Sequence, residues 1–253
     1  MELFKIEFFK YFKSKMYFGY SLALIVCYLL PIFLYQRHDI ELQPLLTARE
    51  IFHFNSYLTL PIITILHFSY FLSNEYSNNT VKLLFSSKFS KEKIFIIKYI
   101  VATITFILQI IPALVLSLIY IYYFYGSTTL MVPNTTIIYN LFETIGKIVF
   151  IQLMLNIYFL TLGSITMCIN TFVKSRILTI LMTFAIIILL KVAPISPGFI
   201  NYTFINGSSV ISGLTSIQPE RYFTIFQIAF SSMGFILLFI LISLFLFRKQ
   251  IVQ

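Results

Sequence analysis

The sequence has few charged residues. Only 11% of its 253 residues are Asp, Glu, Lys or Arg, whereas 59% are hydrophobic. A soluble domain carries about 25% charged residues, because much of any globular surface must face water. The scarcity of charge therefore excludes a soluble globular domain and predicts an integral membrane protein.

Several chemical motifs are also missing. The two cysteines, Cys27 and Cys168, are too few for a disulfide scaffold. No G-x-x-x-x-G-K-[ST] motif occurs, so the chain cannot bind ATP through a P-loop. The three histidines, His38, His53 and His67, are too widely spaced for an ordinary zinc site, and no H-E-x-x-H motif is present. We therefore expect no metal, no cofactor in this chain and no enzymatic activity of its own.

Six apolar runs suit helices that cross a membrane. A crossing helix needs about 20 mostly apolar residues. The runs cover approximately residues 17–35, 51–72, 97–123, 147–169, 177–193 and 223–247. They are continuous rather than alternating, which argues against a β-barrel. We expect an all-α integral membrane protein whose residues 1–253 form one transmembrane domain. The polar stretch after the fifth run, approximately residues 194–222, is expected to form a short outer-face helical segment.

The basic residues are unevenly distributed. Most of the 18 Lys and Arg residues lie at the ends and loops that fall on one side of six spans. Cytoplasmic loops carry such an excess, and an even number of spans brings both termini to that side. The net charge of +9 therefore indicates orientation, with cytoplasmic termini, rather than a nucleic-acid site. No acidic residue lies in the middle of a span, so the usual signature of ion-driven transport is missing.

Residues 1–16 form a candidate surface helix. On a helical projection, aromatic side chains gather on one side and charged ones on the other. The aromatic side holds Phe4, Phe8, Tyr11 and Phe12, and the charged side holds Glu2, Lys5 and Lys13. Such a helix suits the headgroup layer of a membrane. A signal peptide is the alternative interpretation, although no cleavage motif follows the first apolar run.

The segment between the second and third spans carries a short amphipathic pattern. Val81, Leu84 and Phe85 recur at helical spacing, and Ser90 is placed to cap the start of the third span. An apolar face in a cytoplasmic loop fits either a groove on a partner protein or the membrane surface. The pattern alone leaves both interpretations open.

This segment resembles the corresponding loop of ABC-2 type permeases, the membrane subunits of ATP-driven exporters. In those proteins an acidic residue leaves span 2 and is followed by a Thr, an apolar stretch, a Ser-basic pair and a Lys that enters span 3. The matching residues here are Glu75, Thr80, Val81 to Phe85, Ser90-Lys91 and Lys98. The sequence departs from the pattern at Asn79, where Gly is common, and at Phe89, near which Pro is often found. The order of spans and loops is similar over nearly the full chain.

The resemblance implies a coupling helix that docks into a separate cytosolic ATP-binding subunit. The implied contact residues are Glu75, Thr80, Val81, Leu84, Phe85, Ser90 and Lys91. ATP and Mg would be bound by that partner ATPase, and a second permease, identical or related, would complete the transporter. Small permeases of this type resemble exporters of amphipathic antimicrobial or cytolytic peptides and immunity pumps against them, phenol-soluble modulin exporters among them. Export of drugs, polysaccharide or ions stays open.

Polar residues inside the spans are candidates for the substrate pathway. One face of the fourth span holds Gln152, Asn156, Gly163, Thr166 and Asn170. Polar contacts between helices and a pathway lining both explain such a face. The resemblance favours spans 1, 2 and 5 near the subunit boundary, so the pathway candidates are Tyr17, Tyr20, Tyr28, Asn55, Thr59 and His67, together with Asn156. For His67, a hydrogen bond between helices is the alternative to a ligand contact.

A protein of a different class is also compatible with this sequence. A membrane scaffold, or a membrane enzyme of a small-molecule pathway, would need no ATP coupling. In that case the loop between spans 2 and 3 should tolerate substitutions that disrupt a contact with an ATPase. The bias toward Lys, Ile, Phe and Asn, with few alanines, suggests a bacterial source with an AT-rich genome and therefore a bacterial cell membrane.

Overall fold

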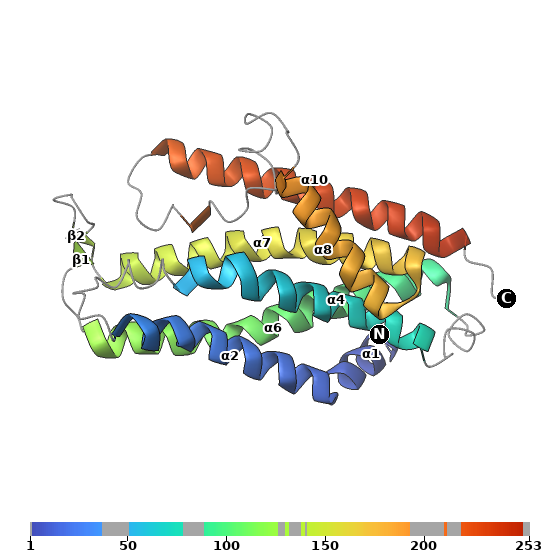
Figure 1. Ribbon diagram of the computed structural model, residues 1–253, viewed down its shortest axis with the longest axis horizontal. Helices are drawn as coiled ribbons and strands as arrows, with labels where there is room; N and C mark the ends of the chain where they lie inside the picture. Colours follow the sequence, from blue (N-terminus) through green and yellow to red (C-terminus); the bar gives the residue numbers. More distant parts are fainter. Residues whose placement is uncertain are drawn as a thin grey trace.

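The computed structural model describes residues 2–36, 51–77, 89–125, 130–131, 138–139, 141–192, 210–211 and 219–249. Within these ranges the chain is almost entirely helical (Figure 1). The helices are α1 (Glu2–Phe12), α2 (Lys15–Gln36), the π-helical turn η1 (Asn55–Thr59), α4 (Leu60–Ser77), α6 (Lys91–Tyr125), α7 (Leu141–Val173), α8 (Arg176–Val192) and α10 (Pro219–Lys249).

Three helices in the described part of the chain are long and apolar enough to cross a membrane. They cover Lys91–Tyr120, Phe142–Val173 and Tyr222–Lys249, and two shorter apolar helices cover Lys15–Pro31 and Arg176–Leu190. The structure thus agrees with the expected class, a helical membrane protein. That all six runs cross the membrane stays a prediction.

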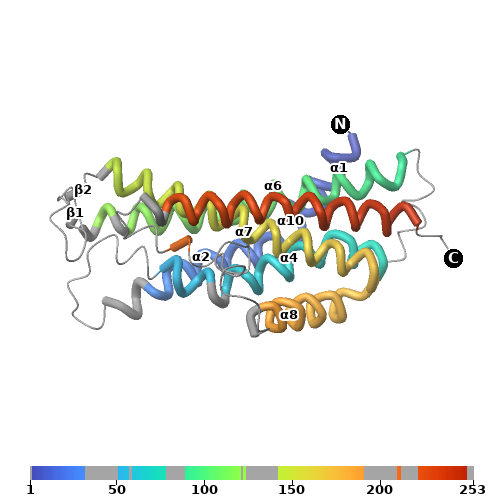
Figure 2. The backbone as a smooth tube through the Cα atoms, turned by 90° about the horizontal axis from the view of Figure 1, so that it is seen from above, coloured from blue at the N-terminus to red at the C-terminus, as the bar shows by residue number. Residues whose placement is uncertain are grey.

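The long helices lie side by side along the bundle (Figures 1 and 2). α10 and α4 pack against α7, and α2 packs against α6. At one end lie α1, the last turn of α4, the first turn of α6, the α7–α8 junction and the last turn of α10. We call this end of the bundle the α1 end. The β1–β2 hairpin lies at the opposite end.

The hairpin is a small correction to the all-α expectation. β1 (Leu130–Met131) pairs antiparallel with β2 (Ile138–Tyr139), with Leu130 opposite Tyr139. The sequence between the strands contains Pro133 and Asn134, residues typical of turns, and the strands are short and apolar. An apolar helical pattern cannot continue through such a segment.

The N-terminal helix is shorter than expected. Residues 1–16 were expected to form one helix, but α1 ends at Phe12 and α2 begins at Lys15. The backbone N–H of Ser14 donates to the Tyr11 carbonyl at 2.8 Å, and the Ser14 hydroxyl accepts from the Tyr17 N–H at 3.2 Å. Ser14 therefore caps α2 and turns the chain between the two helices.

A π-helical turn interrupts the second predicted span. The Leu60 N–H donates to the Asn55 carbonyl, one residue further back than in an α-helix. Pro61 follows immediately; it has no N–H, and its ring crowds the preceding turn. The widened turn at Asn55–Thr59 relieves that crowding.

The segment expected on the outer face, residues 194–222, lies mostly outside the described residues. Val210 and Ile211 are described and buried. The sixth predicted span falls within α10, which begins at Pro219. α8 has 17 residues and covers nearly all of the fifth predicted run.

Candidate functional site

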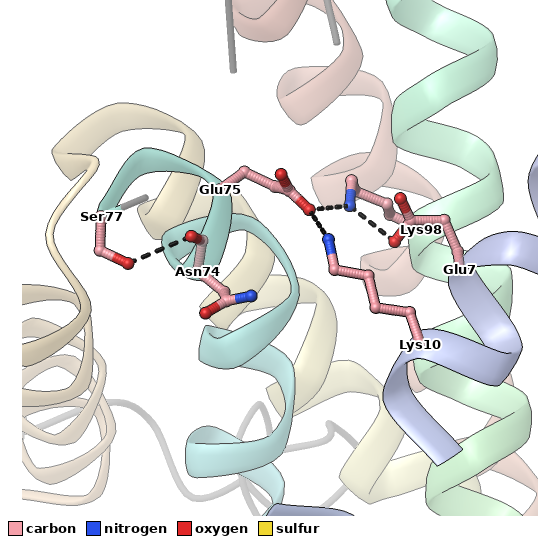
Figure 3. Close-up of polar contacts among 6 residues, drawn as sticks. All are labelled: Glu7, Lys10, Asn74, Glu75, Ser77 and Lys98. Atoms are coloured by element: carbon pink, nitrogen blue, oxygen red, sulfur yellow. Dashed lines mark hydrogen bonds and ion pairs between the residues drawn. The ribbon is translucent and has the colours of Figure 1, made fainter. Parts of the chain in front are cut away.

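Four charged side chains join three helices at the α1 end of the bundle (Figure 3). Lys98 of α6 donates from Nζ to Glu7 Oε2 of α1 at 2.8 Å and to Glu75 Oε1 of α4 at 3.1 Å. Lys10 of α1 donates to the same Glu75 oxygen at 2.5 Å. We call Glu7, Lys10, Glu75 and Lys98 the ion cluster.

Most of the ion cluster is shielded from solvent. The side chains of Glu7, Glu75 and Lys98 are 8%, 5% and 2% exposed, whereas that of Lys10 is 45% exposed. Burial alone would lower the pKa of Lys10, but the hydrogen bond and charge of Glu75 outweigh it, so the pKa is raised. Lys10 therefore stays charged at neutral pH. Its charge balances the second carboxylate, so the cluster can be neutral as a whole.

A second polar contact joins the same three helices. His67 of α4 is fully buried. Its Nδ1 lies 2.7 Å from the Tyr11 hydroxyl of α1, and its Nε2 lies 2.8 Å from the Ala102 carbonyl of α6. Because a carbonyl can only accept, Nε2 carries the proton and Nδ1 accepts from Tyr11. Burial raises the pKa of Tyr11, which keeps this hydroxyl protonated.

The tyrosines of α2 expected near the pathway differ in their surroundings. Tyr28 is fully buried, and its hydroxyl donates to Gln152 Oε1 of α7 at 3.1 Å. The Tyr20 hydroxyl accepts from Arg176 Nη2 at the start of α8 at 2.8 Å. Tyr17 is partly exposed, and its backbone carbonyl accepts from Gln109 Nε2 at 3.2 Å. The Tyr17 ring packs edge-on against Tyr11, with centroids 5.9 Å apart, and the Tyr20 ring centroid lies 6.5 Å from that of His67. Tyr17 and Tyr20 therefore both lie beside the contact between Tyr11 and His67, whereas Tyr28 bonds to α7.

Two of the pathway candidates in the second span lie in the π-helical turn, and the third lies further along α4. Asn55 and Thr59 are both buried in that turn. The Asn55 amide donates to the Ile51 carbonyl at 2.8 Å, while its Oδ1 accepts no hydrogen bond from the described residues. His67 lies further along α4, in the contact with Tyr11. The structure therefore does not bring His67 together with Asn55 and Thr59.

The polar face of α7 is buried between helices. Gln152 donates from Nε2 to Asn156 Oδ1 at 2.9 Å, and Asn170 donates from Nδ2 to the Ser69 carbonyl of α4 at 2.7 Å. Thr166 is fully buried and bonds back to the Leu162 carbonyl. In this conformation Gln152 and Asn170 link α7 to α2 and α4, whereas Asn156 bonds to Gln152 within α7. A pathway role for Asn156 stays a prediction.

Gly163 lets α4 approach the same face of α7 closely. A methyl group at this position would lie 2.5–2.7 Å from three ring atoms of Phe68, which is fully buried. Because the ring is packed on all sides, we expect Gly163→Ala to lower the free energy of unfolding by about 1–3 kcal/mol. Thermal unfolding of the detergent-solubilised protein measures the change.

Gly146 provides the matched control on the same helix. Nothing lies within 4 Å of a methyl group added there. Gly146→Ala is therefore expected to leave stability unchanged or to raise it by up to about 1 kcal/mol. Equal stability of Gly163→Ala and the wild type would contradict the close packing of Gly163 on Phe68.

Comparison with known families identifies the chain. The family model described as ABC-2 family transporter protein matches residues 3–190. The chain belongs to this family. The matched range runs from α1 into α8 and contains the whole ion cluster. No curated protein matches the chain.

Membership confirms the resemblance at the level of the family. This ABC-2 transporter protein is a multi-pass membrane protein, and its family indicates the permease part of an ABC transporter. The closer resemblance to phenol-soluble modulin exporters stays a prediction.

The residues expected to contact an ATPase are only partly described in this ABC-2 protein. Thr80, Val81, Leu84 and Phe85 lie outside the described residues. Ser90 caps α6 as predicted, with its hydroxyl 3.3 Å from the Lys93 N–H, and Lys91 is the first residue of that helix. Glu75 belongs to the ion cluster near the end of α4.

The sequence did not predict the two residues that α1 contributes to the ion cluster. Glu7 and Lys10 were not among the expected site residues. A signal was present, because Glu7 lies on the same helical side as Phe4 and Tyr11, at positions i, i+3 and i+7. A carboxylate on the aromatic side of a membrane-surface helix is costly unless a cation meets it.

Proposed function

We propose that this ABC-2 protein is the six-span permease subunit of a bacterial ABC exporter with both termini in the cytoplasm. It works with a separate cytosolic ATP-binding subunit and a second permease, and it exports amphipathic antimicrobial or cytolytic peptides. The main support beyond the family is the ion cluster, because it holds together the two ends of the segment expected to meet the ATPase.

The distribution of basic side chains supports the orientation. Helix ends at the α1 end carry Lys5, Lys10, Lys13, Lys15, Lys91, Lys93, Lys98, Lys174, Arg176, Arg248 and Lys249. Cytoplasmic ends of membrane helices carry such an excess of Lys and Arg. We infer that this end of the bundle faces the cytoplasm.

The ion cluster supports coupling to an ATPase. Glu75 lies before residues 78–88 and Lys98 lies after them, and their ion pair joins the end of α4 to the start of α6. A force that an ATPase applies to residues 78–88 would therefore move α4 and α6 together. Because the sequence has no P-loop, we propose that ATP and Mg²⁺ bind to the partner and that this chain is not itself an enzyme.

Peptide export is supported by the resemblance to small permeases of peptide exporters. Amphipathic peptides gather at the membrane surface, where a permease can take them up from the bilayer or the cytoplasm. We propose that the path runs along the boundary between two permeases, close to α2. Tyr28, Asn55 and His67 are buried in this conformation, so they would reach a substrate only after the helices move apart.

Transport into membrane vesicles tests the function and the orientation together. The chain is expressed with a candidate P-loop ATPase from the same genome, and ATP and a fluorescent amphipathic helical peptide are added outside the vesicles. We expect ATP-dependent uptake into inside-out vesicles and none into right-side-out vesicles. A Walker-motif Lys→Ala variant of the ATPase is the control. Absence of uptake would contradict peptide export, and uptake of a drug or oligosaccharide instead would replace the substrate class.

A further inference from the structure

α1 is attached to the bundle by polar contacts in addition to the apolar packing of Leu3, Phe4 and Phe8 against the core. The two buried side chains of this helix are Glu7 and Tyr11, whereas Ile6 and Phe9 are 61% and 55% exposed. A helix that only rests on a membrane turns its apolar side away from water and its charges toward it. α1 instead turns a carboxylate toward the protein, where Lys98 meets it.

α1 contacts α4 and α6 at two positions, one helical turn apart. Glu7 contacts α6 through Lys98, and one turn later Tyr11 contacts α4 through His67. His67 in turn bonds to the Ala102 carbonyl, and Lys98 to Glu75, so α4 and α6 are joined to each other at both levels. Directional contacts of this kind resist sliding and rotation of α1 better than apolar packing does.

α1 is also closely connected to α2. Only Lys13 and Ser14 separate the two helices, and the Ser14 hydroxyl caps α2. Gln109 of α6 donates to the Tyr17 carbonyl in the first turn of α2. Any displacement of α1 therefore acts directly on the start of α2.

We propose that Glu7 is a positioning residue that makes α1 move as one unit with the adjoining ends of α4 and α6. Movement of residues 78–88 then reaches α2 through α1. This inference rests on the proposed function, because it assumes that an ATPase moves that segment. It adds the path by which that movement, once it reaches α4 and α6, is passed on to α2.

Among the residues of the ion cluster, Glu7 is the one on which the proposed path from α6 to α1 and α2 depends. Its side chain is 8% exposed and meets Lys98, which is 2% exposed, so water screens their attraction little. Within the ion cluster, the second ion pair of α1 joins Lys10 to Glu75 and involves a lysine side chain that is 45% exposed. Exposed ion pairs hold their partners weakly.

Glu7→Gln tests the proposal with little change in shape. The amide keeps the length and one acceptor for Lys98, and Lys98 keeps its ion pair with Glu75. We expect ATP hydrolysis by the complex to stay within about twofold of the wild type, while peptide exported per ATP falls about tenfold. Amide hydrogen exchange of residues 2–12 should become about tenfold faster, with that of α7 unchanged.

Two variants control this experiment. Glu2→Gln removes the same charge from an exposed position of the same helix and should change neither measurement. Glu7→Asp keeps the charge with a shorter side chain and should restore part of the export per ATP. It also provides the test if Glu7→Gln does not fold.

The two measurements separate the possible failures. Unchanged export per ATP in Glu7→Gln would overturn the proposal, even if exchange in α1 were faster, because Glu7 would then only stabilise α1. Unchanged exchange would overturn it as well, because α1 would not depend on Glu7. If the wild type itself exports nothing, the proposed function fails, and faster exchange still supports the attachment of α1 through Glu7.

Discussion

Replacing Lys98 with methionine is expected to lower the free energy of unfolding by about 3–5 kcal/mol. The variant leaves the carboxylates of Glu7 and Glu75 buried near each other, with only the half-exposed Lys10 to balance them. An uncompensated buried charge is far more costly than the absence of the whole pair. Thermal unfolding in detergent and the folded yield in membranes measure the loss.

A second substitution should rescue this variant. In Glu7→Gln combined with Lys98→Met, the remaining charges are Glu75 and Lys10, which already form an ion pair. We therefore expect the double variant to be more stable than Lys98→Met alone, which is a non-additive effect.

The matched control lies on the same helix. Lys93→Met alters an exposed lysine and should change stability by about 0.5 kcal/mol or less. If Lys98→Met proved as stable as Lys93→Met, the ion cluster would not hold the three helices together.

Replacing Leu84 and Phe85 together with aspartate is expected to abolish ATP-driven export, reducing it by about 100-fold or more. The prediction assumes that these side chains enter an apolar groove of the ATPase. Burial of an unpaired carboxylate there costs several kcal/mol for each residue. Co-purification of the ATPase with the permease should be lost, as measured by affinity capture from membranes.

Stability of this double variant should change little, because neither residue belongs to the ion cluster or to a predicted span. Ser86→Asp adds a charge to the same segment, on the opposite side of the predicted helix, and should preserve binding and export. Retained co-purification and export in the Leu84 and Phe85 variant would contradict the coupling helix. The alternative of a membrane scaffold or pathway enzyme without ATP coupling would then gain support.

Local features of the fold could be predicted well. The helical membrane class follows from long apolar runs, because a chain in hydrocarbon must satisfy its own backbone hydrogen bonds. The Ser90 cap was predictable because a cap depends on residues within one turn. The end of α1 at Phe12 was not predicted, since Ser14 can cap α2 only if the chain turns there.

The candidate site was predictable only in part. Glu75 and Lys98 stood out because both belong to the loop pattern of the family. Glu7 lies 91 residues before Lys98. A helical projection of residues 1–16 shows which side Glu7 occupies but not what that side meets.

The sequence by itself determined the membrane class, the family and the uneven distribution of basic residues. These properties depend on composition and on patterns within single segments. Only the tertiary structure decided that α1 joins α4 and α6 through Glu7, Lys98 and His67, and that the amides of α7 face other helices. The reason is physical: a buried charge or amide needs a partner, and which residue provides it depends on how distant helices pack.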